Sequence, residues 1–138
     1  MRLLCFQVKR FWWKVFEKTL PEAPDVDEER EVRDAVVAFL HIEAGDVSES
    51  RLASVQRQTL KHLKWLANKR GFKIIVLHSF THLGGENAPA AAAHALLMNL
   101  AERLEGSGYQ THVTPFGYFH EWAIDVHGES LAKVWKEI

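Results

Sequence analysis

The sequence is poor in cysteine, in long apolar runs and in excess charge of either sign. Its single cysteine, Cys5, excludes an internal disulfide and a metal cage built from thiolates. No apolar run approaches the ~20 residues that cross a bilayer, and nothing resembles a signal peptide, so we expect a cytoplasmic protein. The formal net charge of -1 lacks the basic excess of proteins that bind nucleic acid mainly through phosphates. Any contact with nucleic acid should therefore be confined to one end or one patch.

The composition is that of a globular domain. Apolar residues make up 47% of the 138-residue chain and charged residues 25%. This length suits one domain with a sizeable core, over residues 1–138.

Alternating and helical patterns predict a mixed β-sheet with helices packed on it, an α/β domain. Two prolines and many acidic residues predict a solvated loop over 21–31. The short Lys9-Arg10 connection indicates a hairpin between the first two strands. We expect strands over 1–8, 11–18, 32–43, 72–80, 109–114 and 118–127, helices over 46–70 and from Pro89, and a short helix from Glu129.

One face of the expected helix 46–70 is basic. It carries Arg51, Arg57, Lys61 and Lys64. A solvated face is the ordinary interpretation of such a pattern, and a patch for the RNA backbone is the alternative.

Two of the eight histidines stand at places where chemistry is expected. His82 lies in the loop THLGGENA between an apolar strand and a helix, where ligands collect in α/β sheets, although a plain connecting loop is the alternative. His120 follows a Pro-Phe-Gly turn and shares a strand face with Tyr118 and Trp122, which we expect to be buried. Imidazole exchanges protons near neutral pH, so these two are the candidate acid–base groups. We expect structural roles for His41, His62, His78, His94, His112 and His127.

Several catalytic signatures are missing. The chain has no Gly-x-Ser-x-Gly elbow and no phosphate loop, and Cys5 has no paired base in view, so a covalent nucleophile is not expected. The spacing of His112, His120, Glu121 and His127 matches no zinc pattern. An enzyme built from this chain should instead direct water or a substrate group, without metal or other cofactor.

The segments VVAFLHIE, FTHLGG and PFGYFHEWAIDVHGESLAK resemble the N-terminal editing domain of archaeal threonyl-tRNA synthetases, and the resemblance covers nearly the whole chain. It implies a D-tyrosyl-tRNA deacylase-like fold, a homodimer and no metal. It also implies hydrolysis of L-serine wrongly attached to threonine tRNA, by water assisted by the terminal 2′-OH. The partners would be the aminoacyl-tRNA and a synthetase catalytic domain, fused or separate. Serine lacks one methyl group of threonine, and such a difference gives only ~10–200-fold discrimination by binding.

The resemblance also implies the residues of the site. His82, His120 and Lys133 are the expected catalytic residues. His120 stands where the family usually has lysine, and Lys133 where it often has glutamate in the terminal helix. Gln7-Val8-Lys9 also departs from the family pattern. We therefore expect His120 to position water or the 2′-OH and Lys133 to supply a cation. The expected substrate-binding residues are Ile42, Phe80, Thr81, His82, Ala92, Phe116, Gly117, Tyr118 and Phe119.

Two alternatives remain open at this point. One is a deacylase for D-aminoacyl-tRNA on the same fold, and the other is a tRNA-docking or dimerisation module without catalysis. Aromatic residues on the outer sheet face, Trp12 and Trp13 among them, would expose apolar surface in a monomer. These tryptophans could instead belong to the core, and the resemblance decides the expectation in favour of a dimer.

Overall fold

One long strand organises the sheet of the computed structural model, which describes residues 1–138. Strand β1 runs for 17 residues, Arg2–Lys18, and pairs antiparallel with β2, Glu29–His41. Its other edge is shared between two strands. β6, Lys133–Glu137, pairs with the first part of β1, and β5, Tyr118–Val126, pairs with the rest. β1 is therefore the centre of the fold, because it holds three partners.

The expected hairpin over 1–8 and 11–18 is wrong. Lys9 and Arg10 lie within β1, where the pairing with β5 shifts register between Val8 and Arg10. Such a bulge adds a residue to one strand and changes which side chains face inward. Val8 and Phe11 are therefore both buried, although they are an odd number of residues apart.

The expected terminal helix is also wrong, because the C-terminal segment completes the sheet. A short 3₁₀ helix covers only Ser130–Ala132, and β6 then occupies the edge of β1, with Trp135 opposite Leu4. Near the start of the helix expected over 46–70, residues Ala44–Val47 form a separate 3₁₀ helix. The α-helix α1 covers only Leu52–Asn68.

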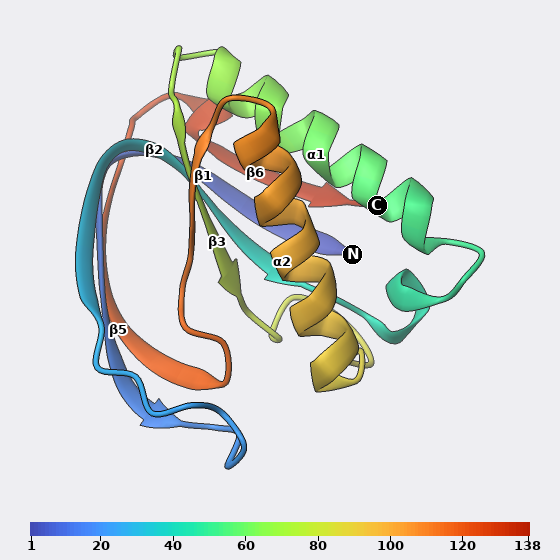
Figure 1. Cartoon of the computed structure of the whole chain (residues 1–138). Coiled ribbons are helices and arrows are strands. Elements are labelled where there is room, and N and C mark those ends of the chain that lie inside the picture. The colour runs from blue at the N-terminus through green and yellow to red at the C-terminus, as the bar shows by residue number, and fades with distance from the viewer.

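The remaining strands are parallel to β2. β3, Ile74–Ser79, pairs with β2, and β4, Gln110–Val113, pairs with β3, which gives the order β4-β3-β2-β1-β5. α1 connects β2 to β3, and α2, Ala90–Gly106, connects β3 to β4. Both helices cover one face of the sheet (Figure 1). The expected mixed α/β fold with packed helices is thus confirmed.

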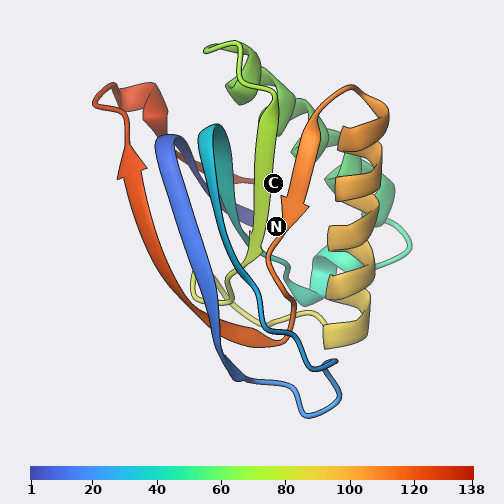
Figure 2. The same ribbon diagram turned by 60° about the vertical axis from the view of Figure 1, so that its left-hand side comes forward.

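The alternation along β2 divides the core in two. Val36, Ala38 and Leu40 belong to the cluster under the helices, whereas Val37 and Phe39 belong to a second cluster on the opposite face. No helix covers that second face. The sheet instead curls around it, with β5 sweeping across the end of the molecule (Figure 2).

Aromatic residues fill the curled face. Trp13 is only 1% exposed, so the expectation that it lies on an outer face is wrong. Trp122 of β5 reaches Phe39, with ring centroids 5.2 Å apart, but stays 42% exposed. The face of β5 that carries His120 is therefore only partly buried, which leaves room for a site.

No helix of the chain has both the length and the apolar character needed to cross a membrane.

Candidate functional site

A cavity of about 490 Å³ lies where the parallel strands β2, β3 and β4 end. Its walls come from the end of β3 and the loop after it, the first turn of α2, the turn between β4 and β5, and Thr19 and Leu20 after β1. The carboxyl ends of parallel strands, next to a helix N-terminus, are where α/β sheets usually bind ligands. The volume is also in the usual range for small-molecule sites.

Almost all of the expected site residues meet at this cavity. Its lining includes Ile42, Phe80, Thr81, His82, Phe116, Gly117, Tyr118, Phe119 and His120. Ala92 does not line it, and the alanines of α2 that do are Ala90 and Ala93. Those two share one face of the helix, whereas Ala92 falls on another. The expected position of Ala92 is therefore corrected to Ala90 and Ala93.

Lys133 lies away from the cavity. It is the first residue of β6, opposite Phe6 of β1, and its ammonium group donates to the carbonyls of Gly128 and Glu129. These carbonyls follow the far end of β5, whereas the cavity is lined by the start of that strand. The expectation that Lys133 supplies the cation of the site therefore does not fit this fold.

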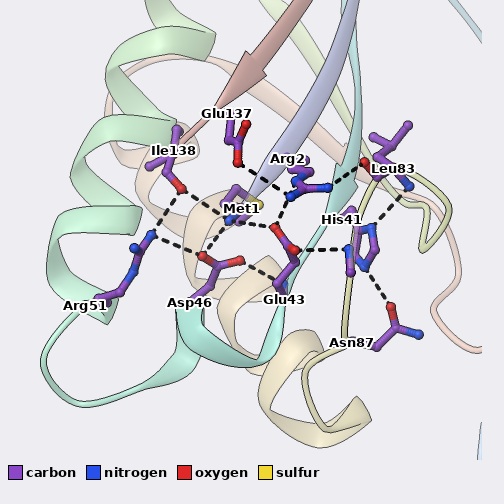
Figure 3. Close-up of polar contacts among 11 residues, drawn as sticks. Met1, Arg2, His41, Glu43, Asp46, Arg51, Leu83, Asn87, Glu137 and Ile138 are labelled. Atoms are coloured by element: carbon purple, nitrogen blue, oxygen red, sulfur yellow. Dashed lines mark hydrogen bonds and ion pairs between the residues drawn. The ribbon is translucent and has the colours of Figure 1, made fainter.

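The loop that carries His82 is held in place by His41 at the end of β2 (Figure 3). Leu83 N–H donates to Nδ1 of His41 at 3.1 Å, so Nε2 carries the proton and donates to Oδ1 of Asn87 at 2.7 Å. His41 is fully buried, as a structural histidine should be. It fixes both ends of the loop and leaves the ring of His82 exposed at the mouth of the cavity.

A second set of contacts supports the same loop from the N-terminal side (Figure 3). Glu43 accepts a hydrogen bond from Gly85 N–H at 3.2 Å and pairs with Arg2 at 3.3 Å. These contacts, together with the nearby N-terminal amino group, hold the pKa of Glu43 below its usual value against the opposing effect of burial. Arg2 also donates to the carbonyl of Leu83. The glycine-rich loop is therefore ordered by charged partners, not merely by its own turns.

The Pro-Phe-Gly turn forms the opposite wall. Gly117 has φ of +83°, and a Cβ there would lie 3.0 Å from Cβ of Ala23 and 3.3 Å from Cβ of Leu20. Its carbonyl accepts hydrogen bonds from the backbone N–H groups of Thr19 and Leu20. Glycine is thus required both by the backbone angle and by the close approach of Leu20 and Ala23, in the acidic loop between β1 and β2.

Tyr118 extends this contact, because its hydroxyl donates to Pro24 O at 2.5 Å and accepts from Val26 N–H at 3.0 Å. The hydroxyl of Tyr118 is therefore engaged with the loop, and its ring is the part that lines the cavity.

Two histidines meet in the cavity. His78, from β3, shares a 2.8 Å hydrogen bond between its Nδ1 and the hydroxyl of Thr114, and its ring packs edge to face against that of His120. Burial, aided by the proximity of His120, lowers the pKa of His78 to about 3. Burial also lowers the pKa of His120, although the charge of Glu28 and the backbone of Tyr118 act in the opposite direction. Both rings are therefore neutral at physiological pH.

His120 differs from His78 in its contacts. Both of its ring nitrogens are buried, and neither has a hydrogen bond of normal geometry within the chain, although the backbone of Tyr118 lies close enough to influence the ring. Buried polar atoms normally have hydrogen-bond partners, so these two nitrogens are the polar atoms of the cavity most in need of one.

Sequence reasoning missed His78 and Thr114. A histidine in an apolar strand reads as structural, which is the role expected for His78. The available signal is its position next to the end of that strand, two residues before Phe80, which places it on the same strand face as Phe80 and beside the ligand-binding edge of the sheet.

Comparison with known proteins shows the family of this chain. The family model described as the archaea-specific editing domain of threonyl-tRNA synthetase matches residues 1–138. The chain belongs to this family of editing domains. The resemblance seen in its sequence motifs is therefore confirmed, and the family is one of proofreading domains.

Curated relatives carry the domain in longer chains. The threonine–tRNA ligase of Hyperthermus butylicus is 29% identical over 140 residues, which are 97% of this chain and 22% of that protein. The threonine–tRNA ligase editing subunit of Aeropyrum pernix is 28% identical over 136 residues, which are 97% of this chain and 31% of that subunit. The chain thus spans between about a fifth and a third of these two relatives.

A solved structure shares the fold. The c-Myc DNA Unwinding Element Binding Protein superimposes with a TM-score of 0.65 at 15% identity, over 100% of this chain and 99% of that chain.

Proposed function

We propose that this editing domain hydrolyses L-seryl-tRNA(Thr), with the terminal adenosine and its seryl group bound in the cavity. The observation that carries the proposal is the cavity itself, which joins a wall of small residues and backbone to a group of aromatic rings in a chain of this family. Gly117, Ala90 and Ala93 leave space for a small amino acid. The rings of Phe80, Phe116 and Trp122 offer surfaces on which an adenine base could stack.

The chemistry proposed is attack by water, not by a side chain. Cys5 cannot serve as a thiolate nucleophile because it is buried and burial raises its pKa to about 12. The water oxygen would bond to the ester carbonyl carbon, the bond from that carbon to the ribose oxygen would break, and the ribose oxygen would leave with a proton. The terminal 2′-OH of the tRNA would assist this step.

His120 is the group proposed to hold the attacking water or the 2′-OH. Its neutral ring offers one acceptor and one donor nitrogen, whereas the lysine usual at this position would offer only donors. His82 is proposed to hold the ribose or the water from the exposed loop at the cavity mouth. His78 would keep His120 in place through the edge-to-face contact of the two rings.

The experiment compares the hydrolysis of three substrates by the purified chain: L-seryl-, L-threonyl- and D-aminoacyl-tRNA. We expect rapid loss of L-serine and slow loss of L-threonine. Cleavage of D-aminoacyl substrates alone would instead make the chain a D-aminoacyl-tRNA deacylase. Binding of tRNA without cleavage of any ester would make it a docking module.

A further inference from the structure

A second hollow lies on the outer surface of the two helices, apart from the cavity. It is lined by Arg57, Leu60, Lys61, Lys64, Trp65 and Asn68 of α1 and by Arg103 of α2. We refer to these seven residues as the α1–α2 groove. α1 and α2 lie side by side on the sheet (Figure 1). Gln56 of α1 and Asn99 of α2 share a 3.0 Å hydrogen bond that joins the two helices. The two helices that form the groove are thus joined by a direct contact.

The four cations of the groove have no acidic partner. None of the ion pairs in the chain includes Arg57, Lys61, Lys64 or Arg103. Arg57 bonds only the neutral hydroxyl of Ser54, at 3.5 Å. The chain as a whole has 18 acidic residues for 17 basic ones, so this excess is local. A concave surface with unpaired cations attracts a polyanion.

An exposed indole lies among these cations. Trp65 is 42% exposed, its ring stacks on His62 with centroids 5.8 Å apart, and the ammonium group of Lys69 lies 5.7 Å from the ring centroid. A tryptophan held in this way by its neighbours presents a flat surface to solvent. Cations for phosphates beside an aromatic ring for a base are the combination that single-stranded nucleic acid requires.

Helix α2 connects the groove to the cavity. Ala93 in its first turn lines the cavity, and Arg103, ten residues later, lines the groove. Ten residues of an α-helix span about 15 Å along its axis. A stacked strand rises about 3.4 Å per nucleotide, so roughly four or five nucleotides cover this length. An RNA whose terminal nucleotide lies in the cavity is thus long enough for its upstream phosphates to reach the groove.

We propose that the α1–α2 groove binds the phosphate backbone of the tRNA acceptor end, upstream of the nucleotide held in the cavity. The inference rests on the proposed function for its substrate. The low net charge of the chain is consistent with this proposal, because a single patch of four cations makes the contact with the phosphates. An RNA, and not an acidic protein, is the occupant because the exposed ring of Trp65 adds a surface for a base.

The test neutralises two groove cations with Lys61→Gln and Lys64→Gln together. The control combines Lys9→Gln and Lys14→Gln, since both lysines are exposed on β1 and form no ion pair. Binding of tRNA that carries no amino acid is measured by fluorescence anisotropy at several salt concentrations. Removing one cation that neutralises a phosphate should reduce the slope of log affinity against log salt by about 1. We expect a reduction of about 2 for the groove variant and none for the control.

Two substrates separate the groove from the cavity. The groove variant should cleave seryl-tRNA with a kcat/KM at least tenfold lower, whereas its cleavage of the seryl ester of adenosine should match the unaltered chain. Trp65→Ala should weaken tRNA binding without changing the salt slope. Equal salt slopes for groove and control variants would overturn the proposal and leave the groove a solvated surface. If the unaltered chain cleaved neither substrate, the proposed function would fail, while the anisotropy data would still decide whether the groove binds RNA.

Discussion

The imidazole rings of His78 and His120 meet edge to face, with centroids 5.3 Å apart and planes inclined by 78°. The two residues come from strands that are not neighbours in the sheet, β3 and β5, and only the curl of the sheet brings them together. The contact places His78, which is held by Thr114, behind His120, whose two ring nitrogens have no hydrogen-bond partner.

His120→Ala should slow seryl-tRNA hydrolysis, because the group proposed to position water is removed. Groups that transfer protons typically contribute about 10²–10⁴-fold, so we expect the rate to fall at least tenfold. His127→Ala is the matched control, since His127 follows the far end of β5 and packs against Phe72. Equal rates for the unaltered chain and His120→Ala would leave His120 with a structural role only.

The rate of the unaltered chain should also depend on pH. Burial holds the pKa of His120 below 6.5, so its neutral form persists to lower pH than that of a free histidine. The rate should therefore be flat from pH 8 to about 6.5 and fall only below that value. Single-turnover rates between pH 5 and 8 measure this, and a profile that falls already above pH 7 would contradict the assignment.

His82→Ala should reduce hydrolysis more than tenfold with little change in stability. The ring is exposed on a loop, where a side chain contributes little to the core, while the loop backbone is held by His41 and not by His82 itself. Hydrolysis rates and thermal melting of the same sample give both values. A variant that melts at the same temperature and cleaves at the same rate would remove His82 from the site.

Because of His78, the free energy of unfolding should be lower in mild acid than at neutral pH. Its pKa is about 3 in the folded chain and 6.5 in the reference state, so between these values the unfolded chain binds a proton that the folded chain excludes. The stabilising effect of the neutral ring is complete above pH 6.5 and diminishes as pH falls toward 3, at about 1.4 kcal/mol per pH unit. From pH 7 to pH 5 the free energy of unfolding should fall by about 2 kcal/mol more for the unaltered chain than for His78→Gln in urea unfolding. Equal decreases in the two proteins would show that His78 titrates normally.

Gly117→Ala should destabilise the chain, because φ of +83° is strained for alanine and the new Cβ would press on Ala23 and Leu20. Such strain typically costs about 1–3 kcal/mol. Gly128→Ala is the control, since a Cβ there meets nothing within 4 Å and its φ is not positive. Urea unfolding of both variants tests this, and equal midpoints would show that the acidic loop moves aside without cost.

The chain should form a homodimer. The curled sheet face has no helix over it, Leu4 and Phe6 on that face are only half-buried, and Phe16 and Phe119 are 69% and 58% exposed. Apolar surface of this kind usually marks an interface. Light scattering should give twice the chain mass, with little effect of salt, because the contact would be apolar. A monomer at every concentration tested would contradict the prediction.

Elements with local patterns could be predicted from the sequence, whereas elements made by distant pairing could not. The helix expected over 46–70 corresponds to α1, which buries Val55, Leu63 and Leu66, and the strand expected over 72–80 corresponds to β3. β6 was missed because its place is set by β1, more than a hundred residues earlier. The continuity of β1 was missed because its two polar residues, Lys9 and Arg10, resemble a turn.

The same distinction applies to the site. Motifs around His82 and Gly117 located two walls of the cavity, because loop and turn residues show in sequence. His78 was not identified as a site residue, because in the sequence a histidine within an apolar strand resembles a core residue. Its contact with His120 of β5 is known only from the fold. Lys133 was misplaced for a related reason, since its position depends on whether the last segment is a helix or a strand.

The position of β1 has a consequence for how the chain acquires its fold during synthesis. β1 is made before its two later partners, because the edge opposite β2 is occupied by residues 118–126 and 133–137, which follow it by about a hundred residues or more. A strand edge without its partner exposes backbone groups that can pair with another chain. The sheet therefore closes only after nearly the whole segment has been made. A nascent chain that stalls near residue 110 would display one open edge of its longest strand to any neighbour.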